Sequence, residues 1–139
     1  LTGTIDVFRY RDGKLTFVQT TSHLSDFTGR SDAADIHVSP DGKFLYASYR
    51  GDLNEIVAYR IDQKSGKLTF AGKQSSLGLG PRNFVIDPTG KYVLVANQKS
   101  DSVVLFYRDT ETGLLTPSDK KIDVGSPVCL VFAAAPKQQ

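Results

Sequence analysis

The sequence predicts an all-β protein made of β-propeller blades, each a sheet of four antiparallel strands, and two internal repeats carry this prediction. Residues 39–47 (SPDGKFLYA) return 48 positions later as residues 87–95 (DPTGKYVLV). A second motif, GKLTF at 13–17, recurs at 66–70 and again as GLLTP at 113–117. Similarity at a spacing of roughly 40–50 residues, made of short strands and glycine turns, is typical of propeller blades.

Residues 33–80 show the pattern of a whole blade most clearly. Runs rich in Val, Ile, Phe and Tyr suit a half-buried pleated surface, and the Pro-Asp-Gly sequence at 40–42 supplies a tight turn between two of them. No stretch has a sustained helical period with capping residues, so we expect almost no helix. The expected strands are 35–38, 44–48, 56–61 and 68–72 in this blade, and 83–86, 92–96, 102–107 and 115–121 in the blade at 81–126.

The ends of the chain match only parts of a blade. Residues 1–32 read as a half blade with strands at 4–10 and 14–21, followed by a connector. Residues 127–132 match a first strand alone, and 133–139 read as a disordered tail. Two whole blades would leave large apolar faces in water, so we expect an incomplete part of a larger ring. The remaining blades would come from missing sequence or from other chains.

Composition excludes several classes of partner. The 139 residues carry a net charge of +2 and no Lys/Arg cluster that would hold a phosphate backbone, so we expect no nucleic-acid partner. No apolar run approaches the roughly 18 residues of a membrane span. The single cysteine, Cys129, forms no internal disulfide and is expected to be a small buried apolar residue. Cytoplasmic localisation is favoured, with the periplasm left open because the chain starts at Leu1 without Met or a signal peptide.

Motifs for metals and cofactors are also missing from the sequence. We find no Cys/His cluster with zinc spacing, no glycine-rich phosphate loop and no Gly-x-Ser-x-Gly elbow. The sequence therefore predicts neither a metal site nor a cofactor.

Positions at which the two blades differ in chemical type are candidates for a function that the fold does not require. His37 occupies a first-strand position that Val85 and Val131 hold elsewhere, and Arg82 stands where Ala34 stands. The polar residues singled out in this way are Asp35, His37, Arg50, Arg82, Asn83, Asn97 and Gln98.

Antiparallel pairing of the first and second strands gathers these residues at one end of the blades. It predicts that Arg50 lies beside residues 33–34 and that 97–98 lie beside 82–83. Because the first strand lies nearest the axis of a propeller, these side chains would line the mouth of the central channel. His23, in the connector, is expected at the same rim and exposed to solvent.

Each candidate also has a structural interpretation. His37 would then be an ordinary strand histidine, and Arg50 and Arg82 would form ion pairs with Asp35 and neighbouring acidic residues that hold blades together. The amide side chains would cap exposed backbone groups. These alternatives stay open from the sequence.

Three segments together resemble the lactonase-type seven-bladed β-propellers. They are residues 34–46 (ADIHVSPDGKFLY), 81–90 (PRNFVIDPTG) and 95–98 (VANQ). This family includes the propeller form of 6-phosphogluconolactonase and the fungal 3-carboxy-cis,cis-muconate cyclase. Residues 126–132 resemble the segment that completes the first blade of such rings. The resemblance implies a ring of seven blades, of which about the last third is present.

The resemblance also implies an activity, the opening or closing of a lactone on a small anionic sugar acid or dicarboxylate without an obvious metal, and we favour the opening of a sugar lactone. It places family rim residues at Asp35, His37, Arg50, Arg82 and Gln98, while Tyr49 departs from the family's usual Asn or Asp. The arginines would hold a phosphate or carboxylate of the lactone or sugar acid, and His37, oriented by Asp35, would act as general base. Asn83, Asn97 and Gln98 would bind substrate.

Three alternatives remain open beside this function. The same rim would serve a lactonizing cyclase of the muconate type, or it would bind a small ligand without chemistry. The chain would otherwise be a structural fragment without a site. Three copies of it, with about two and one-third blades each, would add up to a seven-bladed ring.

Overall fold

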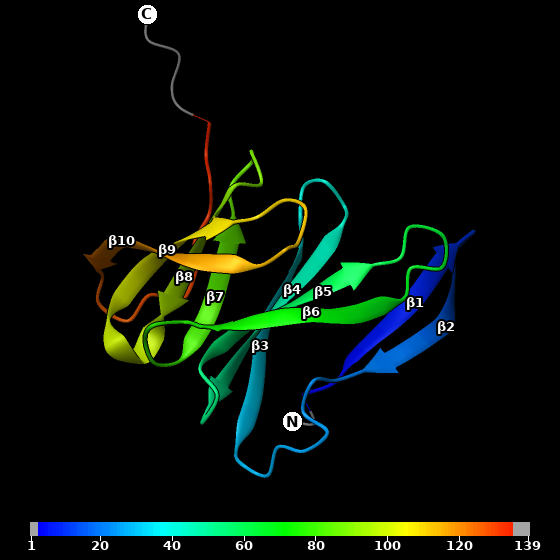
Figure 1. Cartoon of the computed structure of the whole chain (residues 1–139), viewed down its shortest axis with the longest axis horizontal. Helices are drawn as coiled ribbons and strands as arrows, with labels where there is room; N and C mark the ends of the chain where they lie inside the picture. The colour runs from blue at the N-terminus through cyan, green and yellow to red at the C-terminus, as the bar shows by residue number, and fades with distance from the viewer. Residues whose placement is uncertain (1–2, 135–139) are drawn as a thin grey trace, which may run out of the picture.

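The computed structural model describes residues 3–134, and the regular structure of this part is β except for one short 3₁₀ turn. The all-β prediction and the expectation of almost no helix are therefore confirmed (Figure 1). The elements are β1 (Ile5–Arg11), β2 (Lys14–Thr21), β3 (Ser31–Val38), β4 (Phe44–Gly51), β5 (Glu55–Ile61), β6 (Leu68–Ser75), β7 (Pro81–Ile86), β8 (Tyr92–Asn97), η1 (Gln98–Ser100), β9 (Ser102–Arg108) and β10 (Leu115–Asp123).

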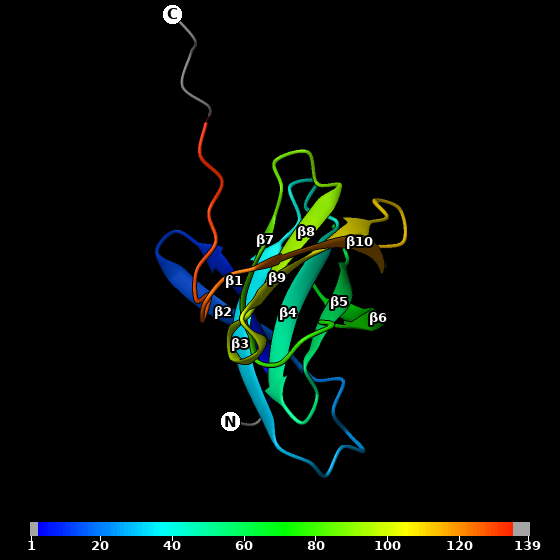
Figure 2. The same ribbon diagram turned by 90° about the vertical axis from the view of Figure 1, so that its left-hand side faces the viewer.

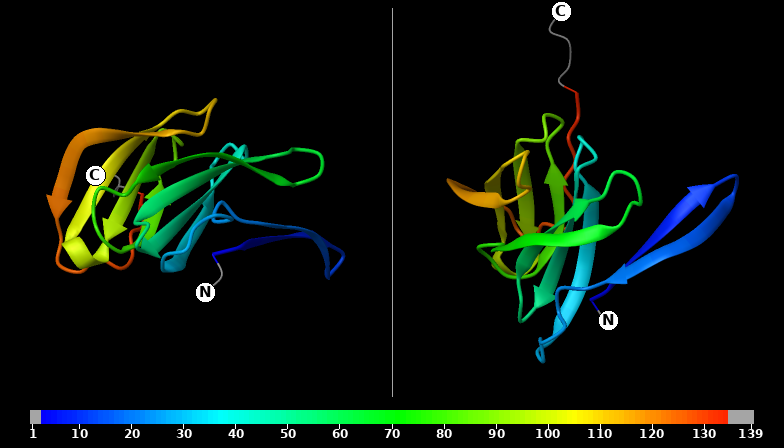
Figure 3. Two further views of the ribbon diagram at one scale, coloured as in Figure 1. Left: turned by 60° about the horizontal axis from the view of Figure 1, so that its bottom comes forward. Right: turned by 45° about the vertical axis from the view of Figure 1, so that its right-hand side comes forward.

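The strands form a hairpin and two four-stranded sheets, each with its strands in sequence order. The sheet β3-β4-β5-β6 and the sheet β7-β8-β9-β10 are antiparallel throughout, as expected for propeller blades. The hairpin β1–β2 lies on the far side of the first sheet from the second and extends away from both (Figure 3). The first strands of the two sheets, β3 and β7, are neighbours (Figure 2).

The turn between β3 and β4 shows how the repeated motif works. Gly42 has a φ of +70°, a conformation that favours glycine, and its N–H donates to the Ser39 carbonyl at 2.8 Å. The Asp41 carboxylate accepts the Ser39 hydroxyl at 2.6 Å and the Lys43 N–H at 3.0 Å. Gly90, with a φ of +72°, makes the corresponding turn of the second sheet.

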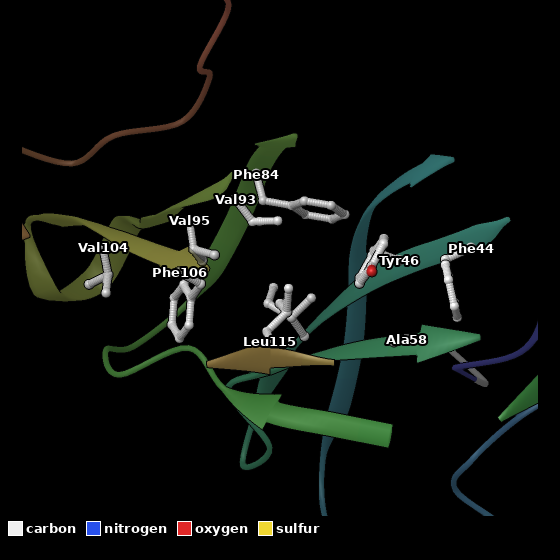
Figure 4. Close-up of a cluster of buried hydrophobic side chains, with 10 residues drawn as sticks. Phe44, Tyr46, Ala58, Phe84, Val93, Val95, Val104, Phe106 and Leu115 are labelled. Atoms are coloured by element: carbon white, nitrogen blue, oxygen red, sulfur yellow. The ribbon is translucent and has the colours of Figure 1, made fainter. Parts of the chain in front are cut away.

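Two apolar clusters hold the three parts together. In the larger one, Phe44 and Tyr46 of the first sheet face Phe84 and Phe106 of the second (Figure 4). All four side chains are fully buried, and burial of each contributes about 1.5–3 kcal/mol. The smaller cluster packs Ile5 and its neighbours in β1 against the first sheet. The blades are therefore layers that bury their faces against one another.

The outer parts of the chain expose apolar side chains that no strand here covers. Tyr10 in β1 is 72% exposed, and Val131 in the segment after β10 is 81% exposed. Residues 127–132, predicted as a first strand, are not in a strand, because no further strand of the described chain lies beside them to pair with. Cys129 is consequently exposed and not buried. Of the predicted tail, residues 135–139 lie outside the described residues.

Among residues 3–134, no helix has the length and apolar character needed to cross a membrane.

Candidate functional site

A polar pocket of about 220 Å³ opens between the first strands of the two blades, where the segment after β10 passes them. We call it the arginine pocket, because two arginines from different blades contribute to it. It is lined by Ala33, Ala34, Asp35, Arg50, Arg82, Asn83 and Val128. The structure thus brings four of the seven predicted site residues to one place.

Two β-bulges shape this pocket. In β3, Ala34 and Asp35 together oppose Ser48 of β4, whose hydroxyl accepts the Asp35 N–H at 3.0 Å. In β7, Arg82 is an extra residue that has no partner in β8. A bulge bends its strand and changes the direction of nearby side chains, which is why bulges recur next to active sites.

Because of the bulge in β3, the observed pairing of β3 with β4 differs from the predicted register by one residue. Arg50 was expected beside Ala33 and Ala34, but it pairs with Asp32 because two residues of β3 oppose one of β4. Arg50 nevertheless lines the same pocket as Ala33 and Ala34. Arg50 therefore reaches its predicted neighbours, although the predicted pairing was one position off.

Asp35 is the most highly connected side chain of the pocket. Its Oδ2 accepts hydrogen bonds from Asn83 Nδ2 at 2.6 Å and from the Phe84 N–H at 3.1 Å, both in the next blade. Oδ2 also contacts His37 Nε2 at 3.0 Å, and Oδ1 accepts the Ile36 N–H at 2.9 Å. Four donors thus converge on one carboxylate, which can accept about four hydrogen bonds.

His37 lies next to the pocket but does not line it. The residue stands two positions after Asp35 in β3, so both side chains leave the same face of the strand. Its ring meets Phe84 edge-on with centroids 4.9 Å apart, and its side chain is 41% exposed. When Nε2 donates its proton to Asp35, Nδ1 carries the lone pair, and Nδ1 has no partner among the described residues. This arrangement leaves one ring nitrogen free to accept a proton.

The two arginines of the pocket have no carboxylate partner among residues 3–134. Arg50 Nε is buried without a hydrogen bond, and Arg82 is exposed. The interpretation that they form ion pairs with Asp35 is wrong, because Asp35 pairs with His37 instead. Guanidinium groups with free donors are suited to holding phosphate or carboxylate through forked hydrogen bonds.

The other predicted residues are placed elsewhere. Asn97 is fully buried and its Nδ2 donates to the Ser76 carbonyl at 2.9 Å, while Gln98 begins the 3₁₀ turn η1 and does not line the pocket. His23, expected in solvent, is only 4% exposed and meets Glu55 Oε1 at 2.7 Å. Its connector folds back onto the first blade, so this histidine is a buried structural residue.

Two lining or supporting residues escaped the sequence comparison. Ser48 corresponds to Ala96 in the next blade, and this polar-for-apolar difference was a usable signal. Val128 occupies the same position in its repeat as Ala34 and Arg82 do in theirs, and all three residues line the pocket. In the described part of the chain, no group of His, Cys, Asp or Glu side chains is placed to hold a metal ion.

Stacked four-stranded antiparallel sheets, with a polar pocket at their first strands, define a part of a β-propeller. The chain belongs to the family of seven-bladed β-propeller lactonases, because the family model "Lactonase, 7-bladed beta-propeller" matches residues 1–132. The resemblance seen in the sequence is thereby confirmed.

Individual relatives agree with the family. A 6-phosphogluconolactonase of Formosa agariphila is 44% identical over 116 residues, which are 83% of this chain and 33% of that protein. A 6-phosphogluconolactonase of Bacillus subtilis is 39% identical over 121 residues, or 86% of this chain and 34% of that protein. The structure of a periplasmic gluconolactonase from Pseudomonas aeruginosa gives a TM-score of 0.93 at 39% identity, covering 98% of this chain and 38% of that one. The chain spans about a third of the length of the curated relatives it matches.

Proposed function

We propose that this chain supplies the arginine pocket and the neighbouring histidine to a lactonase that opens a small anionic sugar lactone. One observation carries the proposal: two arginines that have no carboxylate partner in the described part of the chain line a pocket beside a histidine that a carboxylate orients. Membership of the lactonase family and relatives named 6-phosphogluconolactonase and gluconolactonase support this substrate class.

His37 would act as the general base. With its Nε2 proton held by Asp35, Nδ1 accepts a proton from the water whose oxygen attacks the lactone carbonyl carbon. The bond between that carbon and the ring oxygen then breaks, and the proton on Nδ1 passes to the departing oxygen. The product is the open hydroxy acid.

The arginines would supply binding and electrostatic stabilisation. Arg82 and Arg50 come from different blades, so they can hold an anionic group of the substrate from two sides. A donor aimed at the developing oxyanion lowers the barrier because the charge grows only as the water attacks. The substrate therefore needs a phosphate or carboxylate group near its lactone ring.

The test uses a complete seven-bladed ring that contains this sequence. We expect His37→Ala to lower kcat for 6-phosphogluconolactone about 10²–10⁴-fold, the usual contribution of a general base. Circular dichroism and the unfolding midpoint serve as controls for folding. Turnover unchanged in His37→Ala would remove the assigned role of His37.

The same assay separates the alternatives. Spontaneous hydrolysis in buffer gives the baseline, and gluconolactone gives the comparison without phosphate. A ring that binds the sugar acid but opens neither lactone faster than buffer is a binding module, and the proposed enzyme activity then fails. Net ring closure from the open acid identifies a lactonizing cyclase.

A further inference from the structure

Equivalent residues of the two blades make the same contact with the segment that follows. Asp35 Oδ2 accepts the N–H of Phe84, and Asn83 Oδ1 accepts the N–H of Leu130 at 2.7 Å. Asp35, Asn83 and Cys129 occupy the same position in successive repeats. Asp35 binds the N–H of the residue after Asn83, and Asn83 binds the N–H of the residue after Cys129. The contact is therefore a repeated link between consecutive first strands.

These links join into one chain of hydrogen bonds along the pocket. Asn83 Nδ2 donates to Asp35 Oδ2 at 2.6 Å, so Asn83 is bonded on both sides. We call Asp35, Asn83 and Leu130 the first-strand chain. Arg82 directly precedes Asn83, and Val128 stands two residues before Leu130, so the chain runs beside both of these pocket-lining residues.

We propose that Asp35 and Asn83 are positioning residues that set the geometry of the arginine pocket through the first-strand chain. Asp35 orients His37 and ties the two blades, while Asn83 holds Arg82 at its bulge and draws the segment at 127–132 against the pocket. This role rests on the proposed function, since it assumes that the arginine pocket is the substrate site. It differs from direct proton transfer by Asp35 and from direct substrate binding by Asn83.

The surroundings explain why Asn83 has this effect. The Asn83 side chain holds the Leu130 N–H, two residues from Val128, and so sets how closely this segment lies against the pocket. A bond to a carboxylate such as that from Asn83 to Asp35 is stronger than one between neutral groups. Loss of the Asn83 side chain removes two bonds at once and frees both Arg82 and Val128 to move.

The experiment compares two asparagines in a complete seven-bladed ring that contains this sequence. Asn83→Ala removes both bonds, whereas Asn83→Asp keeps an acceptor for Leu130 but places a second carboxylate against Asp35. Asn54→Asp is the matched control, because Asn54 likewise accepts a backbone N–H, that of Gly80 at 2.8 Å, and donates to a backbone carbonyl. Asn54 does not line the pocket.

Two readouts do not depend on turnover: hydrogen exchange of the Leu130 amide, and calorimetric binding of inorganic sulfate, whose charge does not change over the pH range used. In Asn83→Ala, we expect Leu130 exchange to rise about tenfold and sulfate affinity to fall about tenfold. In Asn83→Asp, sulfate affinity should fall at neutral pH and recover as the pH drops, because one of two adjacent carboxyls takes up a proton and can again donate to the other. Asn54→Asp should change neither readout.

The outcomes separate this inference from the proposed function. Leu130 exchange that is unchanged in Asn83→Ala, or a loss of affinity in Asn83→Asp that does not respond to pH, overturns the positioning role. A wild-type ring that binds no sulfate contradicts the anion pocket of the proposed function, and Leu130 exchange then decides the role of Asn83 alone. For active protein, positioning predicts that Asp35→Asn lowers kcat more than it raises KM, since Asp35 acts by orienting His37.

Discussion

Two arginines near opposite ends of β4 differ in their surroundings. Arg108, the last residue of β9, contacts Tyr46 near the start of β4, whereas Arg50 lies near the end of β4. The Arg108 side chain is 0% exposed, and its three nitrogens donate to the Tyr46 hydroxyl at 2.8 Å, the Gly90 carbonyl at 2.7 Å and Asp41 Oδ2 at 2.9 Å. Arg50 Nε is also buried, but it has no hydrogen-bond partner among residues 3–134. The same residue type is thus fully satisfied at one end of the blade and left with free donors at the other.

This difference indicates which arginine serves the fold and which can serve a ligand. A buried charge destabilises a protein unless it is paired and hydrogen-bonded, so Arg108 is held by groups from both blades. Tyr46 and Asp41 belong to the first blade, as strand and turn residues, and Arg108 and Gly90 belong likewise to the second. Arg108 therefore fastens the blades, whereas the unpaired donors of Arg50 can pair with an incoming anion.

The largest expected effect comes from removing the fastening arginine. We expect Arg108→Ala to lower the free energy of unfolding by about 3–5 kcal/mol, because it leaves Asp41 and two other polar groups without their partner in the seam between blades. Chemical denaturation would measure the loss. Arg11, which has the corresponding place in β1 but is 86% exposed, provides the matched control. Arg11→Ala should change the free energy of unfolding by less than about 0.5 kcal/mol. Equal losses in both variants would contradict the claim that Arg108 fastens the blades.

A smaller loss of stability is expected from Tyr46→Phe, which leaves Arg108 in place but removes one of its hydrogen-bond acceptors. The Tyr46 hydroxyl donates to the Gly113 carbonyl at 2.7 Å and accepts from Arg108 Nε. Burial raises the pKa of this hydroxyl, so it remains protonated and able to donate at all ordinary pH values. Tyr46→Phe leaves both partners unsatisfied and should cost about 2–3 kcal/mol in the same denaturation experiment. A neutral result would show that water replaces the hydroxyl.

At the opposite end of the blade, substitution should affect ligand and not stability. We expect Arg50→Ala and Arg82→Ala each to raise KM for 6-phosphogluconolactone about 10–100-fold, as loss of a charge-assisted hydrogen bond to an anion does. The denaturation midpoint should stay close to wild type. Gluconolactone, which lacks the phosphate, shows whether the arginines bind that group. A destabilised Arg82→Ala variant with unchanged KM would reverse the proposed division of roles.

Much of the fold could be predicted because its signals are local and repeated. Turn residues such as Gly42 and Gly90 fix the hairpins, and alternating apolar runs fix the strands between them. The segment at 127–132 forms no strand in the described chain, because a strand needs a partner beside it and pairing is not a property of the segment alone. His23 was misjudged for a similar reason, since its partner Glu55 is 32 residues away.

The candidate site was only partly predictable because bulges change the register. Comparison of the repeats found Asp35 and Arg82 from their odd chemistry, but regular pairing gave no sign that Arg82 is an extra residue in its strand. It also drew Asn97 into the site, although the end of β8 turns that side chain into the interior. Arg108 went unnoticed because its partners lie in another blade. Contacts between blades are thus the part that a single sequence does not reveal.

The smallest expected effect concerns the carboxylate that faces Arg108. Burial alone would raise the pKa of Asp41, but hydrogen bonds from Ser39, the Lys43 N–H and Arg108 outweigh it and lower that pKa from 3.8 to about 2. Above about pH 4 the carboxylate is ionised in both the folded and the unfolded protein, and its stabilising effect is complete. As the pH falls toward about 2, the unfolded protein takes up the proton first, so this contribution is lost.

Asp41→Asn should remove that part of the pH dependence. The partly exposed position of Asp41 weakens the interaction, so we expect the wild type to lose about 1–2 kcal/mol more than the variant between about pH 4 and pH 2. Asp87 has a lowered pKa as well, because hydrogen bonds in its own turn outweigh burial, but it is present in both proteins and cancels in the difference. Parallel stability curves for the two proteins would mean that Arg108 holds the blades through its neutral acceptors alone, because the charge on Asp41 would then contribute nothing to the seam.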